Sequence, residues 1–147
     1  MNIAIVRSDT EIAACYPVMS ELRPHIAEGE FVERVRRLEE DGYRLVCLWQ
    51  DGVPQAVAGI RTGENLAWGR FLYVDDLVTA PAQRSKGHGA RLLAWIREYA
   101  AKQGCAQLHL DSGLQRLDAH RFYEREGVAK FGFHFAEILA FGNASGR

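Results

Sequence analysis

The stretch that decides the fold runs from Tyr73 to Ala100 and reads YVDDLVTAPAQRSKGHGARLLAWIREYA. Residues 71–79 have the β-branched and aromatic composition of a strand, and Pro81 marks its end. A loop with two basic residues and two glycines follows, and an amphipathic helix begins directly after it. The sequence therefore predicts a strand, a short loop and a helix in immediate succession.

The loop from Arg84 to Ala90, RSKGHGA, has the features of a phosphate site. Backbone N–H groups at the start of a helix lack intrahelical partners, and the helix dipole makes that end positive. Gly87 and Gly89 let a phosphate approach the backbone, where a Cβ would hold it away. We therefore expect the loop to bind a ligand that contains phosphate.

The spacing narrows the choice of ligand. Neither glycine is followed by Lys-Ser or Lys-Thr, so the loop is not the P-loop of nucleoside triphosphate-binding proteins. A dinucleotide fingerprint needs Gly or Ala where this chain has Leu92, although Asp111 does lie about 20 residues further on. A full Rossmann domain has no room here, so NAD binding is a minor alternative. On the loop alone, an ordinary glycine-containing turn is as good an interpretation.

Size and composition limit the class of protein. The chain has 147 residues, a formal net charge of −1 and 48% hydrophobic residues, which predicts a single domain over residues 1–147. This charge does not suggest a nucleic-acid partner, and no apolar stretch approaches the roughly 18 residues of a membrane span. Three scattered cysteines and a start unlike a signal peptide predict a cytoplasmic protein with reduced thiols and no metal site.

Alternation and turn signals predict the remaining elements. The expected strands are 3–7, 43–50, 53–62, 66–79 with a break near Gly69, 106–112 and 131–141. The expected helices are 8–22, which Pro17 kinks or breaks, 30–40, the helix after the loop, and 117–126. Asp51-Gly52 predicts a tight hairpin. The order indicates an α/β (α+β) fold, with a mixed, mostly antiparallel sheet of six to seven strands flanked by four helices.

Two motifs carry a family resemblance. The pattern Arg84-x-x-Gly87-x-Gly89 resembles the acyl-CoA pyrophosphate loop of the GNAT superfamily of N-acetyltransferases. The segment 118–127, DAHRFYEREG, resembles that superfamily's second cofactor-side helix, and is most similar to bacterial aminoalkylphosphonate acetyltransferases and their relatives. Val128 and residues 113–116 depart from the usual pattern. The resemblance covers essentially the whole chain and implies the acyl-CoA N-acyltransferase fold.

The resemblance also implies acetyl-CoA (coenzyme A) as the donor. The backbone of Leu77, Val78 and Thr79 would pair with its pantetheine arm like an added strand. An N–H group there would polarise the thioester oxygen. The pyrophosphate would lie on the loop, whose implied binding residues are Arg84, Ser85, Lys86, Gly87, His88, Gly89 and Ala90.

The acceptor amine needs a base or a water chain, because an alkyl amine with a pKa near ~10.4 is mostly protonated at neutral pH. Asp75, Asp76 and Asp111 are the carboxylates near the strand ends, and only one of the neighbours Asp75 and Asp76 can face a given site. By resemblance we favour Asp76. Alternatively, both carboxylates bind solvent, a cap or Arg70. His109 and His120 are weaker candidates.

The leaving thiolate needs a proton, and Tyr123 is the candidate acid by resemblance. Its pKa near ~10 keeps it protonated at pH 7. Without the resemblance, a core aromatic residue would be the better interpretation. Arg23 and His25, in the loop after the first helix, are candidates to meet an anionic acceptor, or they simply cap the helix.

These features predict an N-acetyltransferase that moves an acetyl group from acetyl-CoA to a primary amine of a small molecule, by direct attack in a ternary complex. A non-catalytic acyl-CoA sensor and a peptide or protein N-acetyltransferase are the alternatives. The sequence leaves open which amine is used and whether the chain forms a homodimer.

Overall fold

The computed structural model describes residues 1–139 of the chain. The chain divides into two compact units, Met1–Leu110 and Asp111–Arg147. The single domain over 1–147 therefore stays a prediction.

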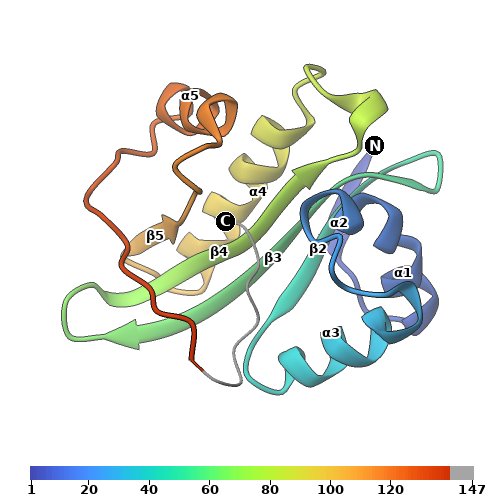
Figure 1. The fold of residues 1–147 in the computed structure, drawn as a ribbon, viewed down its shortest axis with the longest axis horizontal. Helices are drawn as coiled ribbons and strands as arrows, with labels where there is room; N and C mark the ends of the chain where they lie inside the picture. Colours follow the sequence, from blue (N-terminus) through green and yellow to red (C-terminus); the bar gives the residue numbers. More distant parts are fainter. Residues whose placement is uncertain (140–147) are drawn as a thin grey trace. The chain divides into compact units, whose positions relative to one another are not determined.

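The first unit is built on a five-stranded sheet with the strand order β1-β2-β3-β4-β5 (Figure 1). The strands are β1 (Asn2–Ile5), β2 (Arg44–Gln50), β3 (Val53–Asn65), β4 (Gly69–Thr79) and β5 (Gln107–Leu110). Neighbouring strands from β1 to β4 are antiparallel, and β5 runs parallel to β4. The Asp51-Gly52 hairpin is confirmed, since both residues have the positive φ that such a turn requires.

Five α-helices occur in the described part of the chain: α1 (Asp9–Ala14), α2 (Tyr16–Leu22), α3 (Phe31–Glu39), α4 (His88–Lys102) and α5 (Leu117–Arg125). Two short 3₁₀ turns, η1 (Glu28–Glu30) and η2 (Pro81–Gln83), precede α3 and the phosphate-site loop. Helix α1 starts with a reciprocal cap, in which the Glu11 N–H donates to the Ser8 hydroxyl and the Ser8 N–H donates to the Glu11 carboxylate. Local sequence thus determines where α1 begins.

Two predicted counts are wrong: residues 1–139 form a sheet of five strands and not six to seven, and they form five helices and not four. The predicted helix 8–22 is divided in two, because Pro17 has no N–H to donate within a continuous helix and instead occupies the first turn of α2. Residues 131–139 form no strand, although they alternate. Alternation suits a strand, but only backbone pairing makes one. The last two residues of that predicted strand lie outside the described part.

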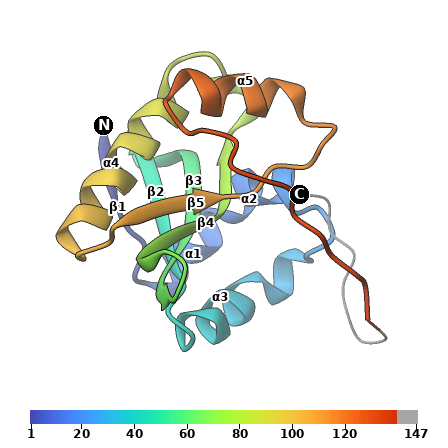
Figure 2. The same cartoon turned by 90° about the vertical axis from the view of Figure 1, so that its left-hand side faces the viewer.

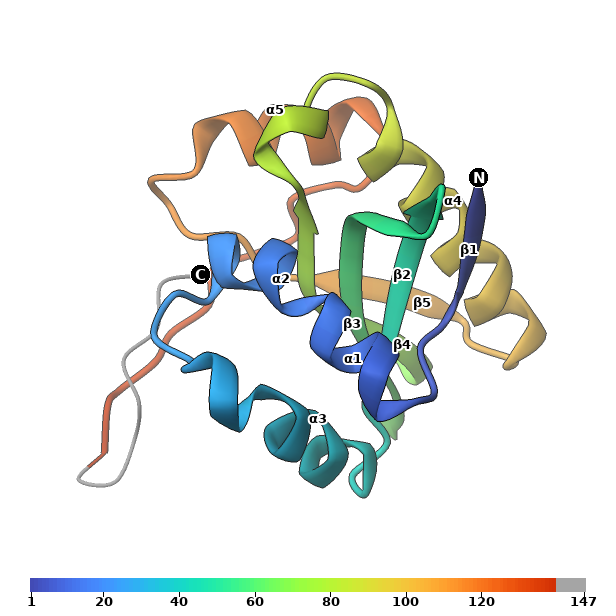
Figure 3. The same cartoon turned by 90° about the vertical axis from the view of Figure 1, so that its right-hand side faces the viewer.

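Helices cover both faces of the sheet in the first unit. Helices α1, α2 and α3 lie on one face and α4 lies on the other (Figures 2 and 3). Ile12, Val35 and Leu45 belong to the core on the α1–α3 face, whereas Leu72 and Leu92 belong to the core on the α4 face. Successive strand residues face opposite sides of the sheet, so the side chains of β4 alternate between these two layers.

Residues 1–139 contain no candidate membrane span and no candidate metal site. None of the helices described there is long and apolar enough to cross a membrane. The same residues contain no group of three or more metal-ligating side chains. Cys15, Cys47 and Cys105 are free thiols, and the first two are buried in the core on the α1–α3 face.

Candidate active site

The sheet opens along one edge of β4. Strand β5 pairs with β4 only from Phe71 to Val74, where Leu110 ends β5. On its other side, β4 stays paired with β3 up to Thr79. Within residues 1–110, the last five residues of β4 therefore have an edge without a neighbouring strand.

The register shows which backbone groups face this edge. The Ala80 N–H donates to the Gln55 carbonyl over 2.8 Å, so the hydrogen-bonded pairs with β3 fall on Ala80 and Val78. The N–H and C=O groups of Leu77 and Thr79 are then directed at the open edge. Two of the three predicted backbone positions thus face it, while the backbone of Val78 is directed at β3.

A β-bulge lies where the edge begins. Gly59 pairs with Asp76 and Ile60 pairs with Val74, so Asp75 is an extra residue on β4. The Asp75 carboxylate accepts two hydrogen bonds from the Arg61 guanidinium, over 2.6 and 2.8 Å. The alternative partner Arg70 donates instead to the Gln103 carbonyl.

The predicted phosphate-site loop leads from β4 into α4. Gly87 is the N-cap of α4 with φ 82°, and Ser85 has φ 65°. The first intrahelical bond runs from the Arg91 N–H to the Gly87 carbonyl, so three N–H groups before Arg91 have no acceptor within the helix. No side chain of residues 1–139 caps this end. The uncapped end suits an anion, and a glycine tolerates the left-handed N-cap.

Side chains around the loop fit the same ligand. Arg84 and Lys86 are exposed and form no ion pair with any of residues 1–139. His88 is only 4% exposed, and neither of its ring nitrogens has a hydrogen-bond partner among the described residues. Most buried polar groups in folded proteins have a hydrogen-bond partner, and His88 is an exception. The uncapped amides and the two exposed cations fit an anion such as the pyrophosphate of a coenzyme A ester.

The structure brings together two residues that the sequence assigned to different roles. The Arg23 Nε donates to Asp76 Oδ1 over 2.8 Å, and the Arg23 Nη2 donates to the Asp75 carbonyl over 2.9 Å. The Tyr43 hydroxyl donates to Asp76 Oδ2 over 2.8 Å. The side chains of Arg23 and Asp76 are 14% and 12% exposed. Both oxygens of the predicted base thus accept hydrogen bonds from within the protein.

Tyr43 is the residue of this cluster that sequence reasoning missed. It is 4% exposed, and burial first, then the negative charge of Asp76, raises its pKa well above the ordinary value of 10.0. Gly59 lies opposite Asp76, and an added Cβ there would overlap both the Tyr43 hydroxyl and an Asp76 oxygen. No local pattern marks either residue, because the cluster forms only when strands and loops are assembled.

Tyr123 belongs to the second unit and lies on α5. Its ring packs edge-on against Phe122 at a centroid distance of 5.4 Å. Burial raises the pKa of its hydroxyl above 10.0, and Arg116 opposes this shift. The group is therefore protonated at neutral pH, as an acid must be.

The histidines have different surroundings. His25 is exposed on the loop after α2. His109 stacks on Trp68 at 3.5 Å between ring centroids, and its Nε2 lies 2.6 Å from the Gln107 side-chain oxygen. His120 Nε2 lies 2.8 Å from the Gly113 carbonyl. Packing and hydrogen bonds thus account for His109 and His120.

With this geometry in place, the comparisons with known proteins identify the class. The profile of the acetyltransferase (GNAT) family matches residues 10–128. The chain belongs to this family. The match includes β4, the loop before α4, and α5.

Relatives and solved structures agree with this assignment. The chain is 38% identical over 133 residues to YhdJ of Bacillus subtilis, an uncharacterised N-acetyltransferase, covering 90% of this chain and 91% of that protein. It is 39% identical over 66 residues to the aminoalkylphosphonate N-acetyltransferase of Salmonella typhimurium, covering 45% and 43%. The solved structure of the aminoglycoside N-acetyltransferase AAC(6')-Iy with CoA superposes with a TM-score of 0.83 at 13% identity, covering 95% of both chains. This last likeness shows the fold.

Proposed function

We propose that the protein transfers an acetyl group from acetyl-CoA to a primary amine of a small molecule, by direct attack in a ternary complex. The observation that carries the proposal is the continuity of two features. The open edge of β4, with the Leu77 and Thr79 backbone groups directed at it, leads through a short loop to the uncapped start of α4. An extended arm that ends in a pyrophosphate has this shape.

The chain's own groups would hold the donor at two places. Leu77 and Thr79 would pair with the amides of the pantetheine arm, as in the addition of a strand to a sheet edge. The first N–H groups of α4 would bind the pyrophosphate, and Arg84 and Lys86 would add charge. Bound acetyl-CoA supplies a thioester that an amine can attack.

Proton transfer at the leaving sulfur falls to Tyr123 in this proposal. A thiolate with a pKa near ~8.5 leaves more readily when a neutral phenol donates a hydrogen bond or a proton to it. Burial keeps the phenol protonated, since it raises the pKa of Tyr123.

A small-molecule acceptor is supported by the relative from Salmonella typhimurium, which is named for an aminoalkylphosphonate. A non-catalytic acyl-CoA sensor would bind the donor and acetylate no amine. A peptide or protein acetyltransferase would acetylate basic peptides in preference to small amines. Turnover with a panel of small amines and peptides separates the three.

Calorimetric titration tests the first step. We expect acetyl-CoA to bind, and NAD and ATP not to bind at the same concentrations. Arg84→Ala and Lys86→Ala should each weaken acetyl-CoA binding, because they remove cations beside the pyrophosphate. If NAD binds and acetyl-CoA does not, the loop is a dinucleotide site and the proposal is wrong.

The Tyr123→Phe variant tests the acid. We expect it to fold and to bind acetyl-CoA like the wild type, and its kcat to fall by about 10²–10⁴-fold. Phe122→Leu is the matched control on the same helix and should keep most of kcat. An unchanged kcat in Tyr123→Phe removes this residue from the mechanism.

A further inference from the structure

A buried cluster joins the end of α2 to β4 at the bulge. It consists of Arg23, Asp76 and Tyr43, which lie far apart in the sequence. Asp76 was predicted as a base and Arg23 as a ligand of the acceptor. In the structure each of them is bonded to the other.

We propose that Arg23, Asp76 and Tyr43 form a positioning clamp, which holds residues 23–27 against β4 beside the donor site. In this role Asp76 takes no proton from the amine, and Arg23 does not bind the acceptor directly. The amine would instead lose its proton to a chain of water molecules. The inference rests on the proposed function for its effect on catalysis, while the clamp itself is a property of the folded chain.

The surroundings of Asp76 oppose a role as base. Each of its oxygens already accepts a hydrogen bond, from Arg23 and from Tyr43. The Asp76 side chain is only 12% exposed, and a donor of the protein holds each of its oxygens. The carboxylate therefore joins β4 to the end of α2.

The surroundings of Arg23 oppose a direct contact with an anionic acceptor. Its Nε is directed at Asp76, and its Nη2 is directed at the Asp75 carbonyl. An acceptor carboxylate or phosphonate would have to compete with Asp76 for the same guanidinium. The arginine is thus used within the protein.

The clamp holds a loop and a strand at one point. Arg23 is the C-cap of α2, and the Tyr16 hydroxyl donates to the Ile26 carbonyl over 2.7 Å, which ties the same segment to α2 a second time. Through the Asp75 carbonyl, Arg23 also holds the bulge that precedes the open edge. The clamp therefore sets the position of residues 23–27 relative to Leu77.

Gly59 makes room for the clamp. Its φ is not in the left-handed region, so conformational freedom does not explain the glycine. Any Cβ at this position would overlap the Tyr43 hydroxyl and an Asp76 oxygen. The glycine is thus required by the close approach of the two side chains.

Four variants of the full chain test the clamp: Asp76→Asn, Arg23→Met, the double variant, and Arg61→Met as control. Arg61 pairs with Asp75 on the same strand, but its side chain is 44% exposed. The clamp predicts that Asp76→Asn and Arg23→Met each raise the KM for the amine by about 10- to 100-fold, because residues 23–27 shift away from their position beside β4. The double variant should be no worse than the worse single variant.

The same variants should not change donor binding, kcat or the pH dependence. We expect the Kd for acetyl-CoA and the kcat to stay within roughly threefold of the wild type, and the pH profile of kcat/KM to keep its inflections. Arg61→Met should match the wild type in all of them.

Two results would overturn the assignment. If Asp76→Asn lowers kcat by about 10²-fold or more and loses an inflection that Arg23→Met keeps, Asp76 is the base. If Arg23→Met raises KM only for anionic amines, and Asp76→Asn does not raise it, Arg23 is a direct acceptor ligand.

Amide hydrogen exchange separates the clamp from the proposed function. Without any substrate, residues 23–27 should exchange faster in Asp76→Asn, in Arg23→Met and in Tyr43→Phe than in Arg61→Met. Unchanged exchange in all three variants contradicts the clamp. Faster exchange in a protein whose wild type acetylates no amine keeps the clamp and refutes the proposed function.

Discussion

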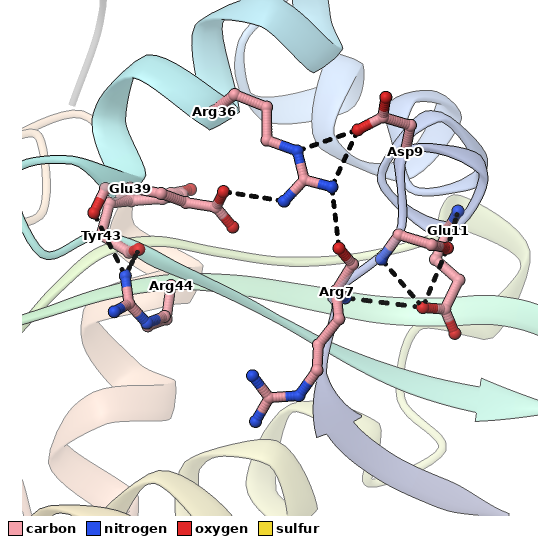
Figure 4. Close-up of polar contacts among 8 residues, drawn as sticks. Arg7, Asp9, Glu11, Arg36, Glu39, Tyr43 and Arg44 are labelled. Atoms are coloured by element: carbon pink, nitrogen blue, oxygen red, sulfur yellow. Dashed lines mark hydrogen bonds and ion pairs between the residues drawn. The ribbon is translucent and has the colours of Figure 1, made fainter.

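Two arginine-centred networks in the first unit have nearly the same geometry and different surroundings. Arg36 on α3 donates to Asp9 over 2.9 Å, to Glu39 over 2.9 Å and to the Arg7 carbonyl over 2.8 Å (Figure 4). Arg23 donates to Asp76 and to the Asp75 carbonyl over 2.8 and 2.9 Å. Each arginine thus joins a helix to a carboxylate and to a backbone carbonyl elsewhere in the chain.

The two networks differ in their exposure to solvent. The side chains of Arg36 and Asp9 are 40% and 73% exposed, whereas those of Arg23 and Asp76 are 14% and 12% exposed. Glu39 and Asp9 raise the pKa of Arg36, but water and salt screen exposed pairs, which contribute little to stability. Removing one partner of a buried pair leaves a charge in a poorly solvated place. We therefore expect burial, and not bond length, to decide which network contributes more to the free energy of unfolding.

The largest effect is expected from Asp76→Ala, which leaves the Arg23 guanidinium buried without its carboxylate. We expect the free energy of unfolding to fall by about 3–5 kcal/mol, measured by urea denaturation at pH 7. Asp9→Ala is the matched control in the Arg36 network and should leave the urea midpoint almost unchanged. Equal losses in the two variants would remove the distinction between the networks.

A smaller effect is expected from Tyr43→Phe, which removes the hydrogen bond to the Asp76 carboxylate. At pH 7 the loss should be about 1.5–3 kcal/mol. Because the pKa of Tyr43 is raised in the folded protein, its contribution is complete below the ordinary value of 10.0 and declines as the pH rises above it. The difference between wild type and variant in urea midpoint should therefore shrink above pH 10. A constant difference from pH 7 to 11 would contradict the assignment.

Gly59→Ala sharpens the comparison without removing any polar group. The added methyl group forces Tyr43 or Asp76 to move, and we expect a loss of about 1–3 kcal/mol in the free energy of unfolding. Gly29→Ala is a matched control, since nothing lies within 4 Å of a Cβ added there. If Gly59→Ala destabilises no more than Gly29→Ala, the cluster is loosely packed.

The smallest effect is expected from Arg36→Met. All of its partners can be solvated in its absence, so the urea midpoint should change by little at low salt and by still less at high salt. Repeating the same denaturation for Arg23→Met should show a large loss at both salt concentrations. A large, salt-independent loss in Arg36→Met would show that exposure is a poor guide in this protein.

Much of the candidate donor site follows from local sequence. Strand β4, the glycine loop and α4 were predicted in order, because a strand composition, a proline and a helix period adjoin within residues 71–102. The family assignment followed from the spacing of Arg84, Gly87 and Gly89 together with the motif on α5, and the family profile bears it out. The individual site residues stay predictions until binding and turnover are measured.

One predicted strand is wrong for the described residues, and the structure decides between the two outcomes predicted at Pro17. Alternation predicted a strand at 131–141, but the described residues 131–139 form none, since a strand exists only where a partner's backbone accepts its hydrogen bonds. Pro17 was expected to kink or break a helix, and it divides that helix into α1 and α2.

By itself, the sequence determined the family, the order of most elements and the loop suited to a pyrophosphate, because each depends on residues close together in the chain. Tertiary structure alone decided the contacts of Arg23, Asp76 and Tyr43. Arg23 and Asp76 lie 53 positions apart, and Tyr43 and Asp76 lie 33 apart. Whether a carboxylate is a free base or half of a buried ion pair depends on what packs against it. Only the folded chain brings those groups together.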